Sequence, residues 1–406
     1  MSAGPTRYHA AWVVPVSAPP IRSGHVDVEN GVILAVGEGP VARHDPGVRV
    51  VRLPSSVLLP GLVNTHTHLE LSDLRGAVPP SASQPVWASR VMSRRSLLGD
   101  ATAGSAMTAA VTELRRSGTA LVGDVGNTQQ SVGALEASAL DAVVFREVLG
   151  FNVGTAEAQT VARTLEAERD ARVGARVRLA VAAHAPYSVA PALFAALREI
   201  DDAGPRSVHV AESAEELELL ERGTGAWRAI LEERGRWVPG WNPPRCGPVE
   251  YLDALGWAGA GTLAVHGVHL TRAELDRLAA SGATLVTCPR SNAWTGAGTP
   301  PIAEFFASGV RVAVGTDSLA SVPDLNLFAE LAALRRIAPS VPAPAILRSA
   351  TVSGAEALAA EDRFGSIRPG RQAALIAVDL SSPVDDVEEY LLGGIEPEQV
   401  TWLEDI

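Results

Sequence analysis

Histidines and carboxylates recur at the ends of short apolar runs in this sequence, and side chains of these two types can bind a divalent metal ion. His66 and His68 form a His-x-His pair, Glu212 comes three residues after His209, and Asp317 follows the last run. Because side chains alternate along a strand, both imidazoles of a His-x-His pair point to the same side. Three histidines and one carboxylate, with one position open to water, are typical of a catalytic zinc site rather than a structural one.

Eight strand-like apolar runs alternate with helical patterns along the middle of the chain. The runs cover residues 57–64, 119–124, 142–147, 177–183, 206–211, 262–265, 283–287 and 310–315. Apolar residues at three- and four-residue steps predict helices over residues 102–116, 191–200, 272–280 and 325–337. Eight alternating units indicate a parallel α/β sheet that closes into a (β/α)8 TIM-like barrel. Reactive groups of such barrels follow the strand ends, which is where His184 and His266 also stand.

The two ends of the chain predict a second, smaller unit. The dipeptide Asn30-Gly31 between apolar runs is a strong hairpin signal, and the C-terminal tail contains a similar strand-like run. We therefore expect a small β-sandwich domain built from residues 1–59 and 365–406 together. The barrel is expected to occupy residues 60–364.

The composition excludes several classes of function. The net charge of −12 argues against nucleic acid as a partner, because that binding needs a basic surface. All 34 Lys-or-Arg positions are arginine, so a lysine Schiff base and a carbamylated lysine bridging two metal ions are both excluded. The two cysteines provide no disulfide framework, and no apolar segment reaches the roughly 20 residues of a membrane helix. We expect a cytoplasmic protein without membrane association whose partner is a small-molecule substrate, with a homodimer as one assembly state left open.

Several motifs together resemble those of the amidohydrolase superfamily, in particular its mononuclear aminohydrolase branch. The resemblance covers nearly the whole chain. The matching motifs are Pro60-Gly61-Leu62-Val63-Asn64-Thr65-His66-Thr67-His68, His184-Ala185-Pro186-Tyr187-Ser188, His209-Val210-Ala211-Glu212, Val265-His266-Gly267-Val268-His269-Leu270, Cys288-Pro289-Arg290-Ser291-Asn292 and Gly315-Thr316-Asp317-Ser318. The resemblance implies a hydrolase that acts on carbon–nitrogen bonds in cyclic amidines.

The resemblance also implies roles for individual residues. One divalent metal ion would be held by His66, His68, His209 and Asp317. Zinc is the expected ion, with iron and manganese as alternatives, and the absence of lysine favours a single ion. Glu212 would carry a proton from water to a ring nitrogen, and His266 would steer the attacking hydroxide. Asp317 would also pass a proton to the departing ammonia. The expected substrate contacts are His184, Glu70, Trp87, Arg90, Ser291 and Asn292.

The substrate is expected to be an amino-substituted nitrogen heterocycle. The loop sequences at residues 68–72 and 288–292 look most like those of the aminodeoxyfutalosine deaminases of menaquinone biosynthesis. Their substrate is an adenine nucleoside that bears a benzoate, which an arginine such as Arg90 or Arg94 would meet. Deamination of S-adenosylhomocysteine or methylthioadenosine, guanine deamination and triazine dechlorination are alternatives. A non-catalytic metal-binding relative is a further alternative, against which the presence of all ligands and of Glu212 argues.

Some residues also have a purely structural interpretation. The competing interpretation of Glu212 is a solvated residue of a first helical turn. Asp124 and Glu147 are interpreted as structural hydrogen-bond acceptors slightly more readily than as ligands. His269 is interpreted as a helix-start residue and Cys288 as a buried apolar residue. Four tryptophans between residues 227 and 257 indicate either the packing of an insertion or a lid over an aromatic substrate.

Overall fold

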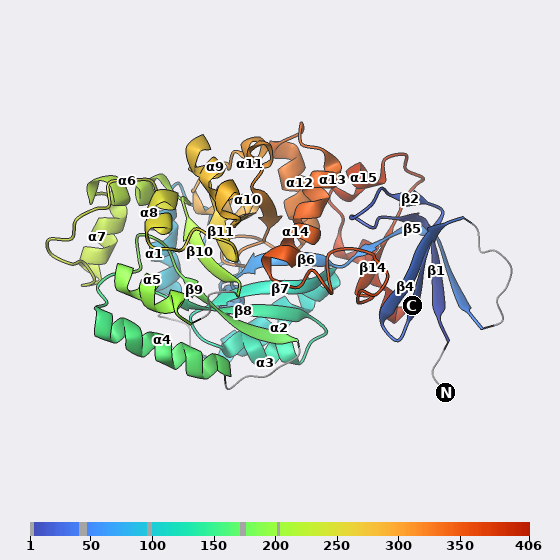
Figure 1. Ribbon diagram of the computed structural model, residues 1–406, viewed down its shortest axis with the longest axis horizontal. Coiled ribbons are helices and arrows are strands. Elements are labelled where there is room, and N and C mark those ends of the chain that lie inside the picture. Colours follow the sequence, from blue (N-terminus) through green and yellow to red (C-terminus); the bar gives the residue numbers. More distant parts are fainter. Residues whose placement is uncertain (1–3, 40–46, 96–99, 171–175, 201–203) are drawn as a thin grey trace.

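A computed structural model describes the chain over residues 4–39, 47–95, 100–170, 176–200 and 204–406. Eight parallel strands form the central sheet in the order β13-β12-β11-β10-β9-β8-β7-β6. Their bounds are β6 Leu62–Thr67, β7 Thr119–Gly126, β8 Asp141–Val148, β9 Val177–Ala183, β10 Arg206–Val210, β11 Thr262–His266, β12 Thr284–Thr287 and β13 Arg311–Val314. Neighbours in this sheet are consecutive in sequence (Figure 1), and hydrogen bonds join β6 to β13 and the residues that follow it, so the α/β barrel is confirmed.

Helices cover the outside of the barrel and leave its strands buried. These helices are α2 Asp100–Arg116, α3 Gln130–Glu136, α4 Thr155–Asp170, α5 Pro191–Arg198, α9 Arg272–Ser281, α11 Ile302–Ser308, α12 Leu327–Ile337, α13 Ala343–Ser349 and α14 Val352–Ala357. Strands enclosed on both faces have continuous apolar sequences instead of alternating ones. Every residue of β7 is buried in this way. The four helices predicted from three- and four-residue spacing correspond to α2, α5, α9 and α12.

The barrel closes at a seam between its first and last strands. In the part of the chain that the structure describes, β6 and β13 share no ladder of strand pairing. Instead, the backbone N–H of Asp317 donates to the carbonyl oxygen of His66 at 3.0 Å. Asn64 bridges the seam as well, because its Nδ2 donates to Thr316 Oγ1 at 2.9 Å and its Oδ1 accepts from the Thr316 N–H at 3.1 Å. The seam therefore joins the segments that carry His66 and Asp317.

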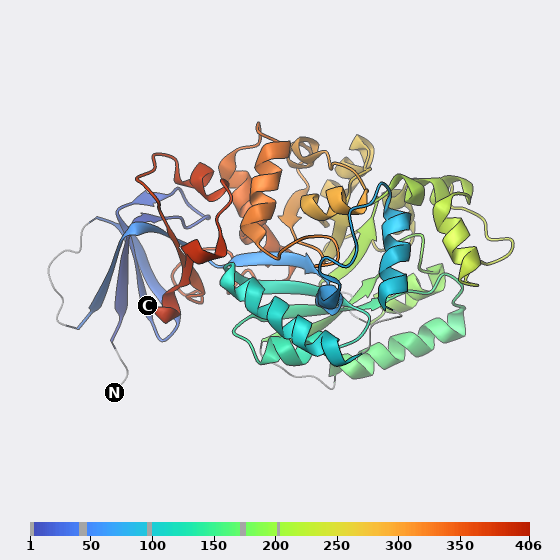
Figure 2. The same cartoon turned by 180° about the vertical axis from the view of Figure 1, so that it is seen from behind.

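A second sheet of seven strands, the chain-end sheet, is built from both ends of the chain. It contains β1 Thr6–Val13, β2 Ile21–Arg22, β3 Gly24–Glu29, β4 Val32–Glu38, β5 Arg49–Pro60, β14 Leu375–Asp379 and β15 Val400–Trp402. The sheet is mixed, because β5 pairs parallel with β1 and antiparallel with β14. Asn30 and Gly31 form the turn between β3 and β4, both with positive φ, as the hairpin signal predicts. The two chain ends thus lie together at one end of the molecule (Figure 2).

The strand predicted over residues 57–64 is wrong as one element. The structure divides it, since β5 ends at Pro60 and β6 begins at Leu62, so one apolar stretch serves both sheets. Gly61 lies at the division, where a Cβ would stand 2.7 Å from Ala120 Cβ and 2.8 Å from the Trp402 ring. Only glycine lets the chain pass through this contact between the two sheets.

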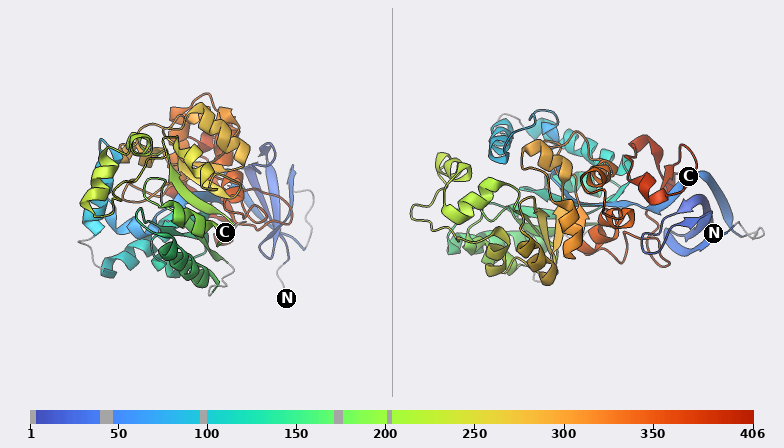
Figure 3. Two further views of the ribbon diagram at one scale, coloured as in Figure 1. Left: turned by 60° about the vertical axis from the view of Figure 1, so that its left-hand side comes forward. Right: turned by 90° about the horizontal axis from the view of Figure 1, so that it is seen from above.

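Further helices lie over the C-terminal ends of the barrel strands or near the chain terminus. They are η1 Leu69–Leu74, α1 Gln84–Arg95, α6 Ala214–Arg222, α7 Ala226–Glu233, α8 Pro248–Ala254, α10 Pro289–Thr295, α15 Val387–Leu391, η2 Pro397–Gln399 and η3 Leu403–Asp405. The yellow-green helices α6 and α7 stand at the end of the molecule opposite to the chain-end sheet (Figure 3). Among the described residues, no helix combines the length and the apolar character needed to cross a membrane.

Replacing Asn64 with alanine should destabilise the barrel at its seam. The change leaves the buried N–H of Thr316 without its acceptor, and an unmet buried polar group costs about 1–3 kcal/mol. Urea unfolding followed by circular dichroism should therefore show a lower midpoint than the wild type. The exposed Asn152→Ala is the control and should unfold like the wild type. Equal midpoints for the two variants would show that Asn64 does not hold the seam.

Candidate metal centre and active site

Three histidines and one aspartate from different strands converge at one end of the barrel. His66 lies on β6 and His68 directly follows it, His209 lies on β10, and Asp317 follows β13. His68 Nε2 is 3.3 Å from His209 Nε2 and 3.7 Å from Asp317 Oδ1. Ligand atoms of His66, His68 and Asp317 all lie within 4.8 Å of one another. The structure thus brings the four predicted metal ligands together.

A divalent metal ion fits this cluster. His66 is buried, and neither of its ring nitrogens has a hydrogen-bond partner in the described part of the chain, which is costly for a polar ring unless a ligand binds it. Burial, with the neighbouring imidazoles, lowers the pKa of His66, so the ring is neutral and keeps a lone pair. Zinc–imidazole bonds of about 2.0–2.1 Å place two tetrahedral ligands about 3.3 Å apart. The Nε2 atoms of His68 and His209 stand at that separation, 3.3 Å.

Neighbouring residues hold the predicted ligands in place. His209 Nδ1 lies 2.8 Å from the carbonyl oxygen of His184, and donation to that carbonyl leaves the lone pair on Nε2, which faces the cluster. Ser291 Oγ donates to Asp317 Oδ2 at 2.5 Å, and the Ser318 N–H donates to Asp317 Oδ1 at 2.7 Å. Both oxygens of the aspartate are therefore fixed before a metal binds.

Glu212 and His266 face each other beside the cluster, with Glu212 Oε2 at 3.6 Å from His266 Nε2. Burial, followed by the negative charge of Asp317, raises the pKa of Glu212 well above its ordinary value. A carboxyl group with a raised pKa holds a proton more strongly than an exposed one, which suits a role in proton transfer. Asn292 Nδ2 donates to His266 Nδ1 at 3.0 Å, which leaves the proton of the neutral ring on Nε2. Glu212 is 5% exposed, so it is not a solvated residue.

The backbone turns sharply where these strands end. Ala211, His266 and Asp317 have positive φ angles of 49°, 81° and 63°, which are costly for residues other than glycine. At the first of these turns, the buried carboxylate of Glu216 accepts the N–H of Ala211 at 3.1 Å and that of Glu212 at 3.0 Å. Glu216 is therefore a positioning residue for Glu212, a role that the sequence analysis did not assign to it.

A cavity of about 610 Å³ opens over the cluster. Its lining includes His68, His209, Glu212, His266 and Asp317. Three of the predicted substrate contacts, His184, Glu70 and Trp87, line it as well. Burial lowers the pKa of His184 to about 4, so its ring is neutral, and its Nδ1 lies 2.6 Å from Ser188 Oγ. The remaining ring nitrogen of His184 is available to a substrate.

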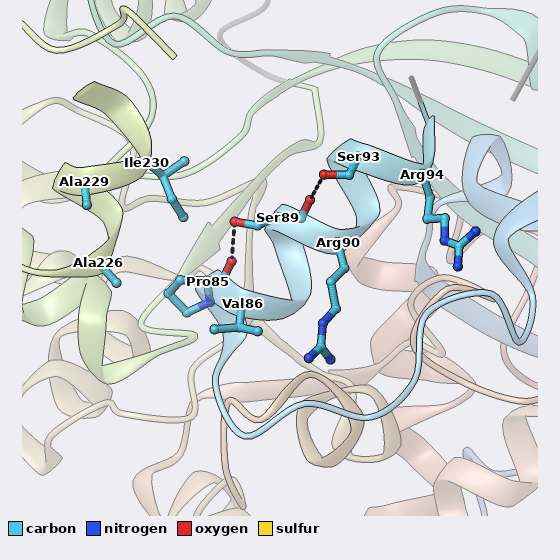
Figure 4. A pocket seen from close by; sticks show the side chains of 9 residues that line it. All are labelled: Pro85, Val86, Ser89, Arg90, Ser93, Arg94, Ala226, Ala229 and Ile230. Atoms are coloured by element: carbon cyan, nitrogen blue, oxygen red, sulfur yellow. Dashed lines mark hydrogen bonds between the residues drawn. The ribbon is translucent and has the colours of Figure 1, made fainter. Parts of the chain in front are cut away.

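The other predicted substrate contacts lie elsewhere. Ser291 and Asn292 are fully buried behind the cluster and do not line the cavity. Arg90 and Arg94 line a separate, open groove between α1 and α7 (Figure 4). The periodicity of α1 explains this, because residues 87, 88, 91, 92 and 95 line the cavity, whereas residues 86, 89, 90, 93 and 94 line the groove. The placement of Ser291, Asn292 and Arg90 therefore gives no support to a direct substrate contact.

The chain matches known proteins over most of its length, and the model of the amidohydrolase family matches residues 57–401. The chain belongs to the amidohydrolase family. It is 30% identical over 375 residues to the 5-methylthioadenosine/S-adenosylhomocysteine deaminase of Nitratidesulfovibrio vulgaris, covering 89% of this chain and 80% of that relative.

Two solved structures extend this comparison. An adenosine deaminase from Xanthomonas campestris with bound zinc is 29% identical, with a TM-score of 0.81 over 98% of this chain and 90% of that one. The aminofutalosine deaminase of Helicobacter pylori is 25% identical, with a TM-score of 0.81 over 96% of this chain and 95% of that one. The predicted enzyme class, a hydrolase of carbon–nitrogen bonds in cyclic amidines, is confirmed.

Residues that the sequence analysis did not single out complete the cavity of this amidohydrolase. They are Gln84, Arg95, Asn127, Phe151, Tyr187, Arg234 and Arg236. The Tyr187 ring stacks on Trp227 with centroids 4.4 Å apart, so the tryptophan-rich insertion forms part of the cavity wall. The Arg-x-Arg pattern within that insertion, at residues 234–236, is the signal that could have identified two of these residues.

In this amidohydrolase, protein groups surround three residues that the sequence analysis interpreted as structural. Asp124 Oδ1 accepts the N–H of Leu69 at 2.8 Å, and burial raises the pKa of Asp124 to about 6. His269 Nε2 lies 2.8 Å from the carbonyl oxygen of Ala297, to which it can donate. Cys288 is fully buried, and burial raises the pKa of its thiol well above the usual value, so the thiol stays protonated.

Replacing His209 with alanine should remove the bound metal from this amidohydrolase. The change deletes one of four predicted ligands, and the wild-type protein should carry about one divalent ion per chain. Inductively coupled plasma mass spectrometry of purified protein should show the loss. His9→Ala, in the chain-end sheet, is the control and should keep the ion. A folded His209→Ala protein with full metal content would remove His209 from the ligand set.

Proposed function

We propose that this amidohydrolase is a zinc-dependent hydrolytic deaminase of an adenosine-like nucleoside. The observation that carries the proposal is the buried carboxyl group of Glu212, which faces His266 at 3.6 Å on the lining of the cavity. Deamination needs a proton-transfer group of this kind next to an activated water. The residues proposed to hold the zinc ion are His66, His68, His209 and Asp317.

The side chains around the metal position account for the proton transfers of this reaction. A bound divalent ion supplies Lewis-acid activation of the attacking water. Glu212 takes one proton from that water and delivers it to a ring nitrogen of the heterocycle, as its raised pKa allows. His266 donates a hydrogen bond from Nε2 to the attacking oxygen. Asp317 passes the second proton to the amino group, the carbon–nitrogen bond breaks, and ammonia leaves.

The names of the relatives support an adenine nucleoside as the substrate. They are described as deaminases of methylthioadenosine and S-adenosylhomocysteine, of adenosine and of aminofutalosine. The zinc ion in the Xanthomonas campestris structure supports zinc as the metal. Triazine hydrolases share the fold at 20% identity, which does not extend to their substrates.

Arginines of the cavity favour a nucleoside that carries a carboxylate on its distal end. Arg234 and Arg236 line the cavity and are exposed, whereas the metal ligands are mostly buried. Guanidinium groups bind carboxylates through paired hydrogen bonds.

Aminodeoxyfutalosine bears a benzoate and S-adenosylhomocysteine bears an amino-acid carboxylate, whereas methylthioadenosine and guanine bear none. We infer aminodeoxyfutalosine as the first candidate, because of the loop sequences at residues 68–72 and 288–292, and S-adenosylhomocysteine as the second. The first would place the enzyme in menaquinone biosynthesis.

A substrate panel tests this proposal. The metal-loaded enzyme should release ammonia from adenosine-type compounds, fastest from aminodeoxyfutalosine or S-adenosylhomocysteine, as followed by the absorbance change of amine loss. Arg234→Ala and Arg236→Ala should lower kcat/KM for these two by roughly 10- to 100-fold, the value of a charged hydrogen bond, and leave methylthioadenosine nearly unchanged. Arg90→Ala, in the outer groove, is the control and should change neither. No ammonia from any of the compounds would overturn the proposal.

Replacing Glu212 with glutamine should abolish turnover while the metal stays bound. The amide has the shape of the carboxyl group but cannot carry the proton, and loss of such a group typically costs about 10²- to 10⁴-fold in rate. Ammonia release and metal content should be measured on the same preparation. Glu215→Gln, in the neighbouring helical turn, is the control and should keep its activity. Ammonia release at the wild-type rate from Glu212→Gln would contradict the assigned role.

A further inference from the structure

One carboxylate oxygen in the cavity wall has no partner. Glu147 lies near the end of β8, lines the cavity, and has a side chain that is only 6% exposed. Its Oε2 accepts a hydrogen bond from Asn127 Nδ2 at 2.8 Å. Its Oε1 is buried and has no hydrogen-bond partner among the described residues. The interpretation of Glu147 as a structural hydrogen-bond acceptor therefore accounts for Oε2 but not for Oε1.

The neighbouring groups leave this oxygen open. His209 Nδ1 lies 3.7 Å from Glu147 Oε1, beyond hydrogen-bond distance, and is 2.8 Å from the carbonyl oxygen of His184 instead. Glu70, another carboxylate of the cavity wall, differs in that it accepts the N–H groups of Asn127 at 3.1 Å and Thr128 at 2.9 Å. Glu70 thus accepts hydrogen bonds from the loop after β7, whereas Glu147 keeps one oxygen without a hydrogen bond among the described residues.

A second metal ion does not account for the open oxygen. Ligand atoms of Glu147, His184 and His209 lie within 4.8 Å of one another. However, both nitrogens of His209 are already engaged, one with the His184 carbonyl at 2.8 Å and one facing His68 Nε2 at 3.3 Å. His184 Nδ1 also lies 2.6 Å from Ser188 Oγ. One carboxylate oxygen and one imidazole nitrogen remain, which are too few ligands for a metal site. A hydrogen-bond donor of the substrate fits better.

The depth of Glu147 in the cavity identifies which part of a nucleoside it meets. Its Oε1 is 3.7 Å from Nδ1 of the candidate ligand His209 and is buried, whereas Arg234 and Arg236 of the same cavity are exposed. We infer that a heterocycle reacting beside Glu212 places its sugar near Glu147 and its distal substituent towards Arg234 and Arg236. The sugar carries hydroxyl groups, which are neutral donors able to reach a buried carboxylate without bringing in a charge.

We propose, on the basis of the proposed function, that Glu147 Oε1 accepts a hydrogen bond from a ribose hydroxyl and so selects ribonucleosides over deoxyribonucleosides. Asn127 acts as a positioning residue, because its amide donates to the opposite oxygen, Oε2, and leaves Oε1 for the substrate. A substrate that lacks the hydroxyl leaves the buried carboxylate oxygen without a hydrogen bond. The free-energy cost of this missing hydrogen bond is the source of the discrimination.

The test compares the best nucleoside of the substrate panel with its 2′-deoxy and 3′-deoxy counterparts. The wild-type enzyme should show a kcat/KM that is lower by about 10- to 100-fold for at least one deoxy compound. Glu147→Ala should lower kcat/KM for the ribonucleoside by a similar factor and erase the discrimination, because the acceptor is gone for all three compounds. Glu147→Gln, which keeps the shape and a neutral acceptor, should retain a smaller discrimination. Glu166→Ala, on the outer surface of α4, is the matched control and should behave like the wild type.

The possible outcomes test the proposed function and the role of Glu147 separately. If the wild type deaminates no nucleoside, the proposed function fails and this inference fails with it. If the wild type is active but accepts the deoxy compounds equally well, or if Glu147→Ala keeps the wild-type discrimination, only this inference is overturned. Metal analysis is the second readout, because Glu147→Ala should keep its ion. A folded variant that loses the ion would assign Glu147 to the metal and also overturn the inference.

Discussion

The burial of a cluster of imidazoles at the barrel strand ends is the constraint on which the rest of this structure depends. His66 is buried, and among the described residues neither of its ring nitrogens has a hydrogen-bond partner, an arrangement that a bound cation would stabilise. The convergence itself depends on the seam, where the N–H of Asp317 donates to the carbonyl of His66 at 3.0 Å. Because the closing contact of the barrel and the candidate ligands belong to the same segments, folding and metal binding are expected to be coupled.

Some residues around the cluster of candidate metal ligands line the cavity. Others do not reach the cavity but hold the lining residues in position. Ser291 and Asn292 belong to the second group, since they bind Asp317 and His266 from behind. Their helix, α10, is anchored by Arg290, which binds the buried Glu330 through Nε at 2.6 Å. Glu216 does the same for the turn that carries Glu212. The turn at Ala211 and the helix α10 are thus held by buried Glu216 and by the Arg290–Glu330 pair, which preorganises the residues around the cluster.

The cavity combines the candidate metal position with carboxylates and arginines, an arrangement that we propose suits a nucleoside with an anionic end. We assign three regions to the cavity lining, namely the candidate ligands with Glu212, then Glu147 with its unpaired oxygen, and then the exposed Arg234 and Arg236. A heterocycle, a sugar and a carboxylate would meet these regions in that order. The proposed chemistry therefore lies at the strand ends, whereas the proposed substrate selection involves α1, β8 and the insertion after β10. That division is typical of barrel enzymes.

Periodic and local features of this protein were determined by the sequence alone. The alternation of strands and helices, the shared direction of His66 and His68 and the exclusion of a lysine-bridged metal pair follow from backbone periodicity and residue type. Only the tertiary structure decided that residues 57–64 serve two sheets, that Arg90 faces an outer groove while Arg95 faces the cavity, and that one oxygen of Glu147 stays open. These outcomes depend on which elements pack against each other across long stretches of chain, and no local pattern contains that information.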